Sequence, residues 1–468
     1  MIIDISKKDI IWSYLAQFFS LAAGVFILPA VLKLLTPEEV GMNYLLLTIN
    51  SMIILFDFGF SPQFSRNITY VFSGAQNIKK EGIDISPNDE INYKLLSNVI
   101  STAKFVYKRL AVFALVIMVT IGTLYIYHAT DGFVSVKNGG VIWIIFSIST
   151  FFNLYYSYYN VLLIGKGLIT ISKKATVYSK LVYLILAFSL LYLDFGLIGL
   201  CIANFAAPFV NRFIAYYHFF TPDIKEKISK YDISESEKKE VFKIIWSNAK
   251  KLGLVYFGSF AISRFGIFFA GAFLTLQDVA SYGIMTQLGG VIIVLSSTFF
   301  NANMPRFASL RVKNERESLI KLLGISIDIY YILAIIGCLV LICVVPISLT
   351  YIQSNTYLPS TEIIILYSIF LFLEGNHSIF STFITTDNRI PFVKPALIVG
   401  AIMTIFNYIV LAYTPLAILG LVLVQGIVQL AYSNWKWPQY VCRSLHINII
   451  QLIKIGISEL HIKIKRAI

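Results

Sequence analysis

Charged side chains are scarce in this sequence. Asp, Glu, Lys and Arg make up 13% of its 468 residues, whereas soluble globular proteins carry about 25%. Apolar runs of roughly 20 residues, the length that crosses a bilayer core, recur along the whole chain, and the mean hydropathy is +0.76. This composition excludes an ordinary soluble domain and predicts an all-α polytopic membrane protein.

Cysteines and catalytic motifs are also scarce. The four cysteines, Cys201, Cys338, Cys343 and Cys442, stand singly, so they predict neither a disulfide framework nor a metal site. The sequence contains no Walker A loop, no HExxH pair and no GxSxG elbow. We therefore expect no ATP hydrolysis, no metal and no cofactor, and we do not expect an enzyme.

Twelve segments are long and apolar enough to form membrane helices, the form in which a chain satisfies its own backbone in lipid. They are 10–34, 41–61, 107–127, 141–164, 176–193, 196–219, 250–274, 279–302, 319–346, 361–384, 391–413 and 415–437. The stretch 67–106 is expected to be an exposed loop flanked by helical turns.

The basic residues orient these spans. If the N-terminus is cytoplasmic, 35 of the 38 Lys and Arg residues fall on the inner side, and only Lys33 and Lys137 fall outside. Arg264 remains within a span. Because cytoplasmic loops are enriched in Lys and Arg, the count predicts that both termini are cytoplasmic. The net charge of +13 then belongs to a solvated inner face that contacts anionic lipids, rather than to a nucleic-acid site.

The chain carries an internal repeat. Leu35–Val40 (LTPEEV) matches Leu274–Val279 (LTLQDV), and Phe60–Arg66 (FSPQFSR) matches Phe300–Arg306 (FNANMPR). Six spans separate the copies, so they share one orientation in the membrane, as parallel repeats do. Two parallel six-helix lobes follow, with a substrate cavity between them: residues 1–219 and 250–437, joined by a cytoplasmic linker helix at 220–249. The tail at 438–468 is expected to lie on the inner membrane surface.

Ionisable residues within spans are costly and often functional. Arg264, in the seventh span, is predicted to face the substrate or to pair with a carboxylate such as Asp328 or Glu374. Glu374 and His377 share one helix face, so they are candidates for proton or cation coupling; the alternative is a polar packing patch. Asp328 is a further coupling candidate.

Asp57 and Arg66 flank a predicted helix break at Gly59 and Pro62. A break there would let Arg66 fold back onto Asp57 as a gate, or both residues could simply anchor the helix at the interface.

Four tyrosines cluster in the fourth span, at 155, 156, 158 and 159. Tyrosine rings stack on sugars, and they also form aromatic belts at the membrane interface. Both interpretations stay open. Tyr155 and Tyr159 are the candidates for substrate contact.

With these features, the chain resembles the polysaccharide-transporter branch of the superfamily that also contains the multidrug and toxin extrusion (MATE) transporters. The likeness is to Wzx-like flippases of O-antigen and capsular repeat units. It rests on Leu35–Gly41 after the first span, on Phe56–Ser61 with Arg66 after the second, and on twelve spans in two lobes. Flippases of peptidoglycan precursors usually carry fourteen spans, so the count of twelve favours the repeat-unit branch.

The resemblance implies an inner-membrane flippase in bacteria, acting in lipopolysaccharide or capsule biosynthesis. Its substrate would be an oligosaccharide linked to undecaprenyl diphosphate, and polysaccharide polymerase and chain-length machinery are candidate partners. Family members hold the diphosphate in a cationic cavity. Arg264 fits that role, and Arg66 and Arg306 would assist at the cytoplasmic mouth. The departure is that Arg264 is the only arginine expected deep in the membrane.

Two other functions stay open from the sequence. One is a drug or cation antiporter of the MATE type. An arginine deep in the membrane would repel a cationic drug, which weighs against this function. The other is a membrane-embedded polymerase or glycosyltransferase. Such an enzyme would need a sizeable loop bearing catalytic residues, and the outer connections here, none longer than about 15 residues, are too short for one.

Overall fold

The computed structural model describes residues 7–79, 90–312, 315–387 and 391–467, and all regular elements in these ranges are helical. By their internal contacts the residues form two compact units, Met1–Phe257 and Gly258–Ile468. The division falls inside one long helix, α12 (Glu235–Phe273).

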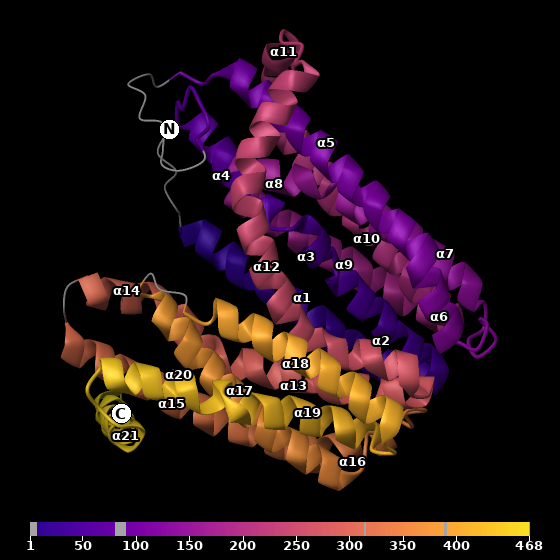
Figure 1. Ribbon diagram of the computed structural model, residues 1–468, viewed down its shortest axis with the longest axis vertical. Coiled ribbons are helices and arrows are strands. Elements are labelled where there is room, and N and C mark those ends of the chain that lie inside the picture. The colour runs from indigo at the N-terminus through magenta and orange to yellow at the C-terminus, as the bar shows by residue number, and fades with distance from the viewer. Residues whose placement is uncertain (1–6, 80–89, 313–314, 388–390, 468) are drawn as a thin grey trace. The chain divides into compact units, whose positions relative to one another are not determined.

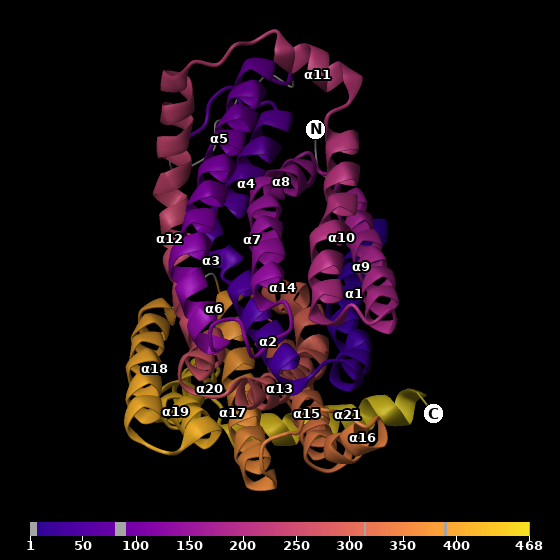
Figure 2. The same cartoon turned by 90° about the vertical axis from the view of Figure 1, so that its right-hand side faces the viewer.

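In the residues that the structure describes, the first unit contains eleven helices, a π-helical turn and the start of α12 (Figure 1). They are α1 (Lys7–Leu34), α2 (Pro37–Ser51), α3 (Ile53–Asp57), α4 (Phe60–Phe72), α5 (Tyr93–Ile117), the π turn Met118–Gly122, α6 (Thr123–Ala129), α7 (Gly139–Tyr155), α8 (Ser157–Gly165), α9 (Ile169–Tyr192), α10 (Gly196–Phe219), α11 (Pro222–Ser229) and α12. Helix α9 lies beside both α1 and α10, and α5 packs along α7 (Figure 2).

The described part of the second unit contains the rest of α12 and ten further elements. They are α13 (Leu276–Ala302), α14 (Met304–Val312), α15 (Arg316–Leu339), the π turn Val340–Val344, α16 (Val345–Tyr351), α17 (Thr361–Thr385), α18 (Val393–Tyr413), α19 (Ala417–Ala431), α20 (Ser433–Ser444) and α21 (Ile449–Ala467). Helix α15 packs against both α13 and α21.

Eleven helices in the described part of the chain are long and apolar enough to cross a bilayer. They account for every predicted span except the seventh, 250–274. That span is the second half of α12, where the described apolar segment is only Arg264–Phe273. Large apolar side chains such as Leu124, Ile185 and Ile347 are 71%, 65% and 70% exposed, as expected for a surface that faces lipid. The chain is a multi-pass, all-helical membrane protein, as its composition predicts.

Several helix boundaries differ from the prediction. The third span begins at Tyr93, well before residue 107, because the Asn92 side chain accepts a hydrogen bond from the Leu95 amide at 2.9 Å and caps α5. The second, fourth and twelfth spans are each interrupted, near Phe58, Tyr156 and Tyr432. Residues 80–89 of the predicted loop lie outside the described residues.

The duplication is visible in the backbone. Thr36 begins α2 with a capping box in which its hydroxyl accepts from Glu39, and Thr275 begins α13 in the same way with Asp278. Both bonds are 3.2 Å long. A π-helical turn also interrupts the third span of one copy and the corresponding ninth span of the other. These pairs of features extend the sequence repeat to local structure.

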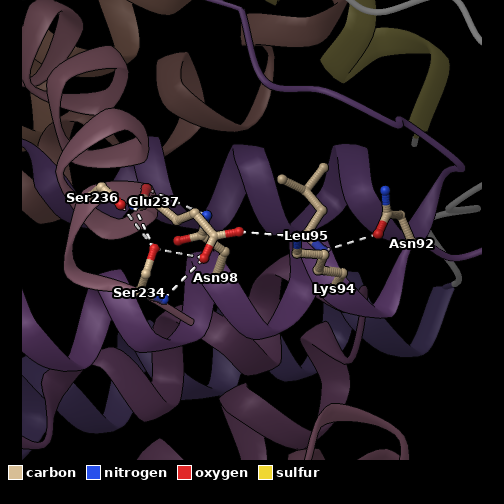
Figure 3. Close-up of polar contacts among 7 residues, drawn as sticks. All are labelled: Asn92, Lys94, Leu95, Asn98, Ser234, Ser236 and Glu237. Carbon is tan, nitrogen blue, oxygen red and sulfur yellow. Dashed lines mark hydrogen bonds and ion pairs between the residues drawn. The ribbon is translucent and has the colours of Figure 1, made fainter. Parts of the chain in front are cut away.

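An ion pair and a hydrogen bond join the start of α12 to α5 within the first unit (Figure 3). Glu237 accepts hydrogen bonds from the amide and hydroxyl of Ser234, at 2.9 and 2.8 Å, and its carboxylate lies 3.0 Å from the Lys94 ammonium group. The Glu237 carbonyl accepts from the Asn98 amide at 3.4 Å. The region predicted as a linker, 220–249, therefore contains α11 and a capped helix start that contact α5.

We expect Ser234→Ala to cost about 1 kcal/mol of local stability, the usual effect of losing an N-cap. The bonds from Ser234 and Lys94 lower the pKa of Glu237 to about 2. Because the folded-state pKa lies below the ordinary 4.5, this stabilisation is complete above pH 4.5 and is lost as the pH falls towards 2. Hydrogen exchange of the first turn of α12 measures both effects: it should be faster in Ser234→Ala than in the wild type, and faster in the wild type as the pH falls towards 2.

Glu226→Gln is the matched control, because Glu226 forms an ion pair with Lys230 on the same helix region and both side chains are exposed. Such pairs contribute little. If Glu237→Gln and Glu226→Gln changed exchange in the first turn of α12 equally, the proposed cap would be wrong.

Candidate functional site

The break in the second span lies between α3 and α4. Phe58 and Gly59 have positive φ angles of 46° and 75°, a conformation that only glycine adopts without strain. Asp57 then accepts hydrogen bonds from the Ser61 amide, the Ser61 hydroxyl and the Tyr107 hydroxyl, at 3.0, 2.9 and 2.7 Å. A carboxylate at this position is favourable because it meets the free amides at the start of α4.

The predicted gate pair between Asp57 and Arg66 is not formed. Arg66 donates instead to Gln63 at 2.5 Å. The reason is geometric: α4 is a regular helix after Phe60, so Arg66 lies about 9 Å along its axis from the N-terminus, at 1.5 Å per residue. The break serves to start α4, and Asp57 caps it.

A cavity of about 750 Å³ lies within the first unit, lined by α4, α8, α9 and α10 together with the end of α7. Three cationic side chains line it: Arg66, Lys180 and Arg212. No aspartate or glutamate of the described chain does so. The remaining lining is rich in hydroxyl and amide groups, which include Ser61, Ser65, Asn153, Asn160, Thr176 and Asn211. The cavity is therefore positively charged.

Arg212 is the most buried of these cations, at 8% exposure. Its Nη2 donates to Asn153 Oδ1, and its guanidinium lies 4.4 Å from the centre of the Phe209 ring and 5.4 Å from that of Tyr156. Its Nη1 is buried and has no hydrogen-bond partner in the described part of the chain. A buried cation without a counter-ion is costly, so this group is suited to bind an anionic ligand.

The tyrosine cluster contributes one side chain to the cavity, Tyr156. The predicted contacts, Tyr155 and Tyr159, do not line it; their rings pack against the Tyr156 ring at 4.8 and 5.4 Å. Tyr155 also stacks on Phe151 at 5.9 Å. Tyr155 and Tyr159 therefore pack against the Tyr156 ring rather than line the cavity themselves.

Arg264 is not the only arginine inside a predicted span. Arg212 lies inside α10 and is buried, and Lys180 lies inside α9. Arg212 falls within the predicted span 196–219 and Lys180 within the predicted span 176–193. A charged residue inside an apolar span is the sequence signal that marks both as candidate cavity residues. Each lies near one end of its span, and by the positive-inside pattern such residues are expected on the solvated inner face.

A second cavity, of about 550 Å³, lies within the second unit. It brings together three predicted residues, since Arg264 from α12 and Glu374 and His377 from α17 all line it. Arg264 forms no ion pair with a carboxylate of the described residues, so the predicted structural pair with Asp328 or Glu374 is not present.

Glu374 and His377 have separate partners in this cavity. Glu374 Oε2 accepts from Gln425 Nε2 at 2.6 Å, and His377 Nδ1 lies 2.8 Å from Asn434 Oδ1. The two side chains share a helix face as predicted, but each is held by an amide from another helix rather than by the other.

Two further predicted residues lie elsewhere. Arg306 is exposed on α14 and lines neither cavity. Asp328 is 4% exposed on α15, and its Oδ2 has no hydrogen-bond partner in the described ranges. It faces α21, where a Cβ atom on Gly456 would lie 2.0 Å from that oxygen.

Solved structures share this fold. An inward-facing multidrug resistance transporter of the MATE family and MOP superfamily aligns with a TM-score of 0.65 at 16% identity, over 94% of this chain and 99% of that one. Lipid II flippase MurJ, in an inward closed conformation, aligns with a TM-score of 0.62 at 16% identity, over 96% and 91%. A MATE structure in a bent conformation gives 0.51 at 15% identity, over 94% of both chains.

No protein-family model and no curated relative matches the sequence. At these low identities the structural likeness shows the fold, which is that of MOP-superfamily membrane transporters. It is shared by proteins described as drug transporters and by one described as a lipid II flippase, so the fold by itself does not select a substrate.

Proposed function

We propose that this protein is a flippase that moves an oligosaccharide linked to undecaprenyl diphosphate from the inner to the outer leaflet of the bacterial cytoplasmic membrane. The observation that carries the proposal is the cavity of the first unit, with three cations, no lining carboxylate among the described residues and an unpaired Arg212 nitrogen. A diphosphate offers several anionic oxygens, and guanidinium groups bind such oxygens with two parallel hydrogen bonds.

The rest of that cavity suits the first sugars of such a lipid. Tyr156 presents an aromatic ring, and the amides of Asn153, Asn160 and Asn211 both donate and accept hydrogen bonds. The polyprenyl tail would stay in the bilayer. O-antigen or capsular repeat units are the substrate class, and polymerase and chain-length proteins would act on the product.

Transport would proceed by alternating access between two lobes, 1–219 and 250–437, and would be driven by an ion gradient. Glu374 and His377 are the proposed coupling residues because they lie in one cavity, and Asp328 is a further candidate. Arg264 would contact the substrate from the second lobe, and Arg306 and Arg66 would act at the cytoplasmic mouth.

The charge of the first cavity distinguishes this function from its alternatives. A cationic drug would meet Arg66, Lys180 and Arg212 with no carboxylate to offset them, which disfavours a drug antiporter. A polymerase or glycosyltransferase would need catalytic carboxylates beside the diphosphate group, and this cavity presents none among its described lining residues.

Two assays test the proposal. Expression of the wild type in a flippase-null strain is expected to restore surface polysaccharide, and purified protein in proteoliposomes is expected to flip a fluorescent undecaprenyl-diphosphate glycan. If instead the chain restores no polysaccharide in any host tested but confers resistance to cationic drugs, the flippase proposal fails.

In the same vesicles, Glu374→Gln is expected to lose the dependence of transport on a proton gradient. Full gradient-dependent transport by this variant would exclude Glu374 as a coupling residue.

A further inference from the structure

Two amide side chains in the cavity of the second unit have no role in the function proposed above. Asn407 on α18 and Gln429 on α19 line this cavity, and they are only 2% and 3% exposed. The side-chain oxygen of each is buried and has no hydrogen-bond partner in the described part of the chain. Because buried polar atoms are nearly always bonded, these oxygens indicate a site whose partner is a bound molecule.

The charges around the two amides argue against an ionic ligand. Arg264 and Glu374 line the same cavity with opposite charges. The arginine opposes a bare cation, and the carboxylate opposes an anion. The cavity of the first unit, by contrast, carries three positive charges and no negative one in its described lining. The second cavity therefore suits an uncharged molecule rich in hydrogen-bonding groups.

Aromatic rings supply the other half of the site. Trp437 and Phe392 line the cavity and contact each other at nearly right angles, with ring centres 5.9 Å apart. Trp437 is 4% exposed, so its ring is held firmly. An aromatic face is electron-rich and attracts the C–H face of a sugar ring, while amides bind the hydroxyl groups on the sugar's rim.

We infer that the cavity lined by Asn407, Gln429 and Trp437 binds an uncharged sugar residue, a hexose or an N-acetylhexosamine. Its volume of about 550 Å³ falls within the range of small-molecule pockets. The assignment of this sugar to the transported glycan rests on the proposed function. It gives the second unit a substrate-recognition role distinct from the diphosphate binding of the first.

The test uses the full-length protein in detergent, with glucose and N-acetylglucosamine as probes, and measures binding by saturation-transfer NMR. Asn407→Leu and Gln429→Leu are each expected to weaken sugar binding about 10-fold, the effect of one lost hydrogen bond to a ligand whose own group is left unpaired. Neither is expected to lower the melting temperature without sugar, because neither amide oxygen is bonded within the described protein.

Asn376→Leu is the matched control. Asn376 lies on α17 in the same unit, accepts from the Tyr331 hydroxyl at 3.0 Å and does not line the cavity. It should show the opposite pattern, with a lower melting temperature and unchanged sugar binding. A merely structural role for Asn407 would instead lower its melting temperature and leave sugar binding unchanged, and that result would overturn the inference.

Two further outcomes separate this inference from the proposed function. If inorganic pyrophosphate binds and the lipid-linked glycan is flipped, but neither sugar binds, the sugar site is wrong and the flippase stands. If the sugars bind but pyrophosphate does not, and no glycan is flipped, the flippase proposal fails and the sugar site stands. Stabilisation by sodium chloride but not by sugars, lost in Asn407→Leu, would make the cavity a cation site and overturn the inference.

Discussion

Replacing Arg212 by glutamine is expected to reduce flipping of the diphosphate-linked glycan about 10- to 100-fold while leaving the melting temperature little changed. A hydrogen bond to a charged group is worth about 1.5–3 kcal/mol, and each 1.4 kcal/mol is a factor of ten. The fold should tolerate the change because the Arg212 Nη1 is buried without a partner among the described residues. Transport in proteoliposomes and binding of inorganic pyrophosphate measure the effect.

Arg109→Gln is the control for the loss of one positive charge. Arg109 is exposed on α5, lies over the Phe105 ring at 4.0 Å and lines neither cavity. It should keep wild-type pyrophosphate affinity and transport. Arg212→Lys should retain part of the activity, because lysine keeps the charge but not the paired donors. Wild-type transport by Arg212→Gln would show that the substrate's anionic group binds elsewhere.

Replacing Gly456 by alanine is expected to destabilise the second unit by about 1–3 kcal/mol, the usual cost of overpacking a close contact. A Cβ atom at this position would lie 2.0 Å from Asp328 Oδ2 and 2.5 Å from the carbonyl carbon and oxygen of Gly324. Two of these three atoms are backbone, so a side-chain rotation cannot relieve the clash. Thermal unfolding in detergent, with limited proteolysis between α20 and α21, measures the loss.

Gly290→Ala is the matched control, because a Cβ atom on Gly290 would meet no heavy atom within 4 Å. In a helix with open space, alanine is more stable than glycine by up to about 1 kcal/mol. The two variants should therefore shift the melting temperature in opposite directions. If both raised it, the contact between α15 and α21 would not be the close one that the structure describes.

This contact shows that the tail helix α21 packs against α15. Leu452 is fully buried, and Glu459 lies 3.2 Å from Lys321 of α15. The amphipathic pattern of residues 438–468 predicted a helix at the inner surface. It did not show that Gly456 and Gly324 bring two backbones together, because that depends on a glycine more than a hundred residues away.

The sequence was a good guide to the candidate site of the second unit. Arg264, Glu374 and His377 were identified because each places an ionisable group inside an apolar span, and all three line one cavity. Their partners, Gln425 and Asn434, were not identified. An amide in a span is common and carries no charge, so nothing local distinguishes one that bonds to Glu374 from one that only packs.

It was a poorer guide to the first unit. Arg66 was identified, but Arg212 and Lys180 were counted with the solvated inner face. A charge near the end of a span can reach the headgroups or turn into a cavity, and the two arrangements have the same sequence pattern. Tyr156 was likewise one of four tyrosines in a cluster, and only the break between α7 and α8 decides which ring faces the cavity.

What the sequence by itself determined is the class of the protein: an all-helical membrane chain, the approximate positions of most of its spans and its internal duplication. These follow from local quantities, since length, hydropathy and helix caps act over a few turns. Only the tertiary structure decided which polar groups meet. Arg66, Lys180 and Arg212 come together because the rotation and crossing of three helices are set by packing between segments far apart in the chain. That packing leaves a cationic cavity in one unit and a cavity with both charges in the other.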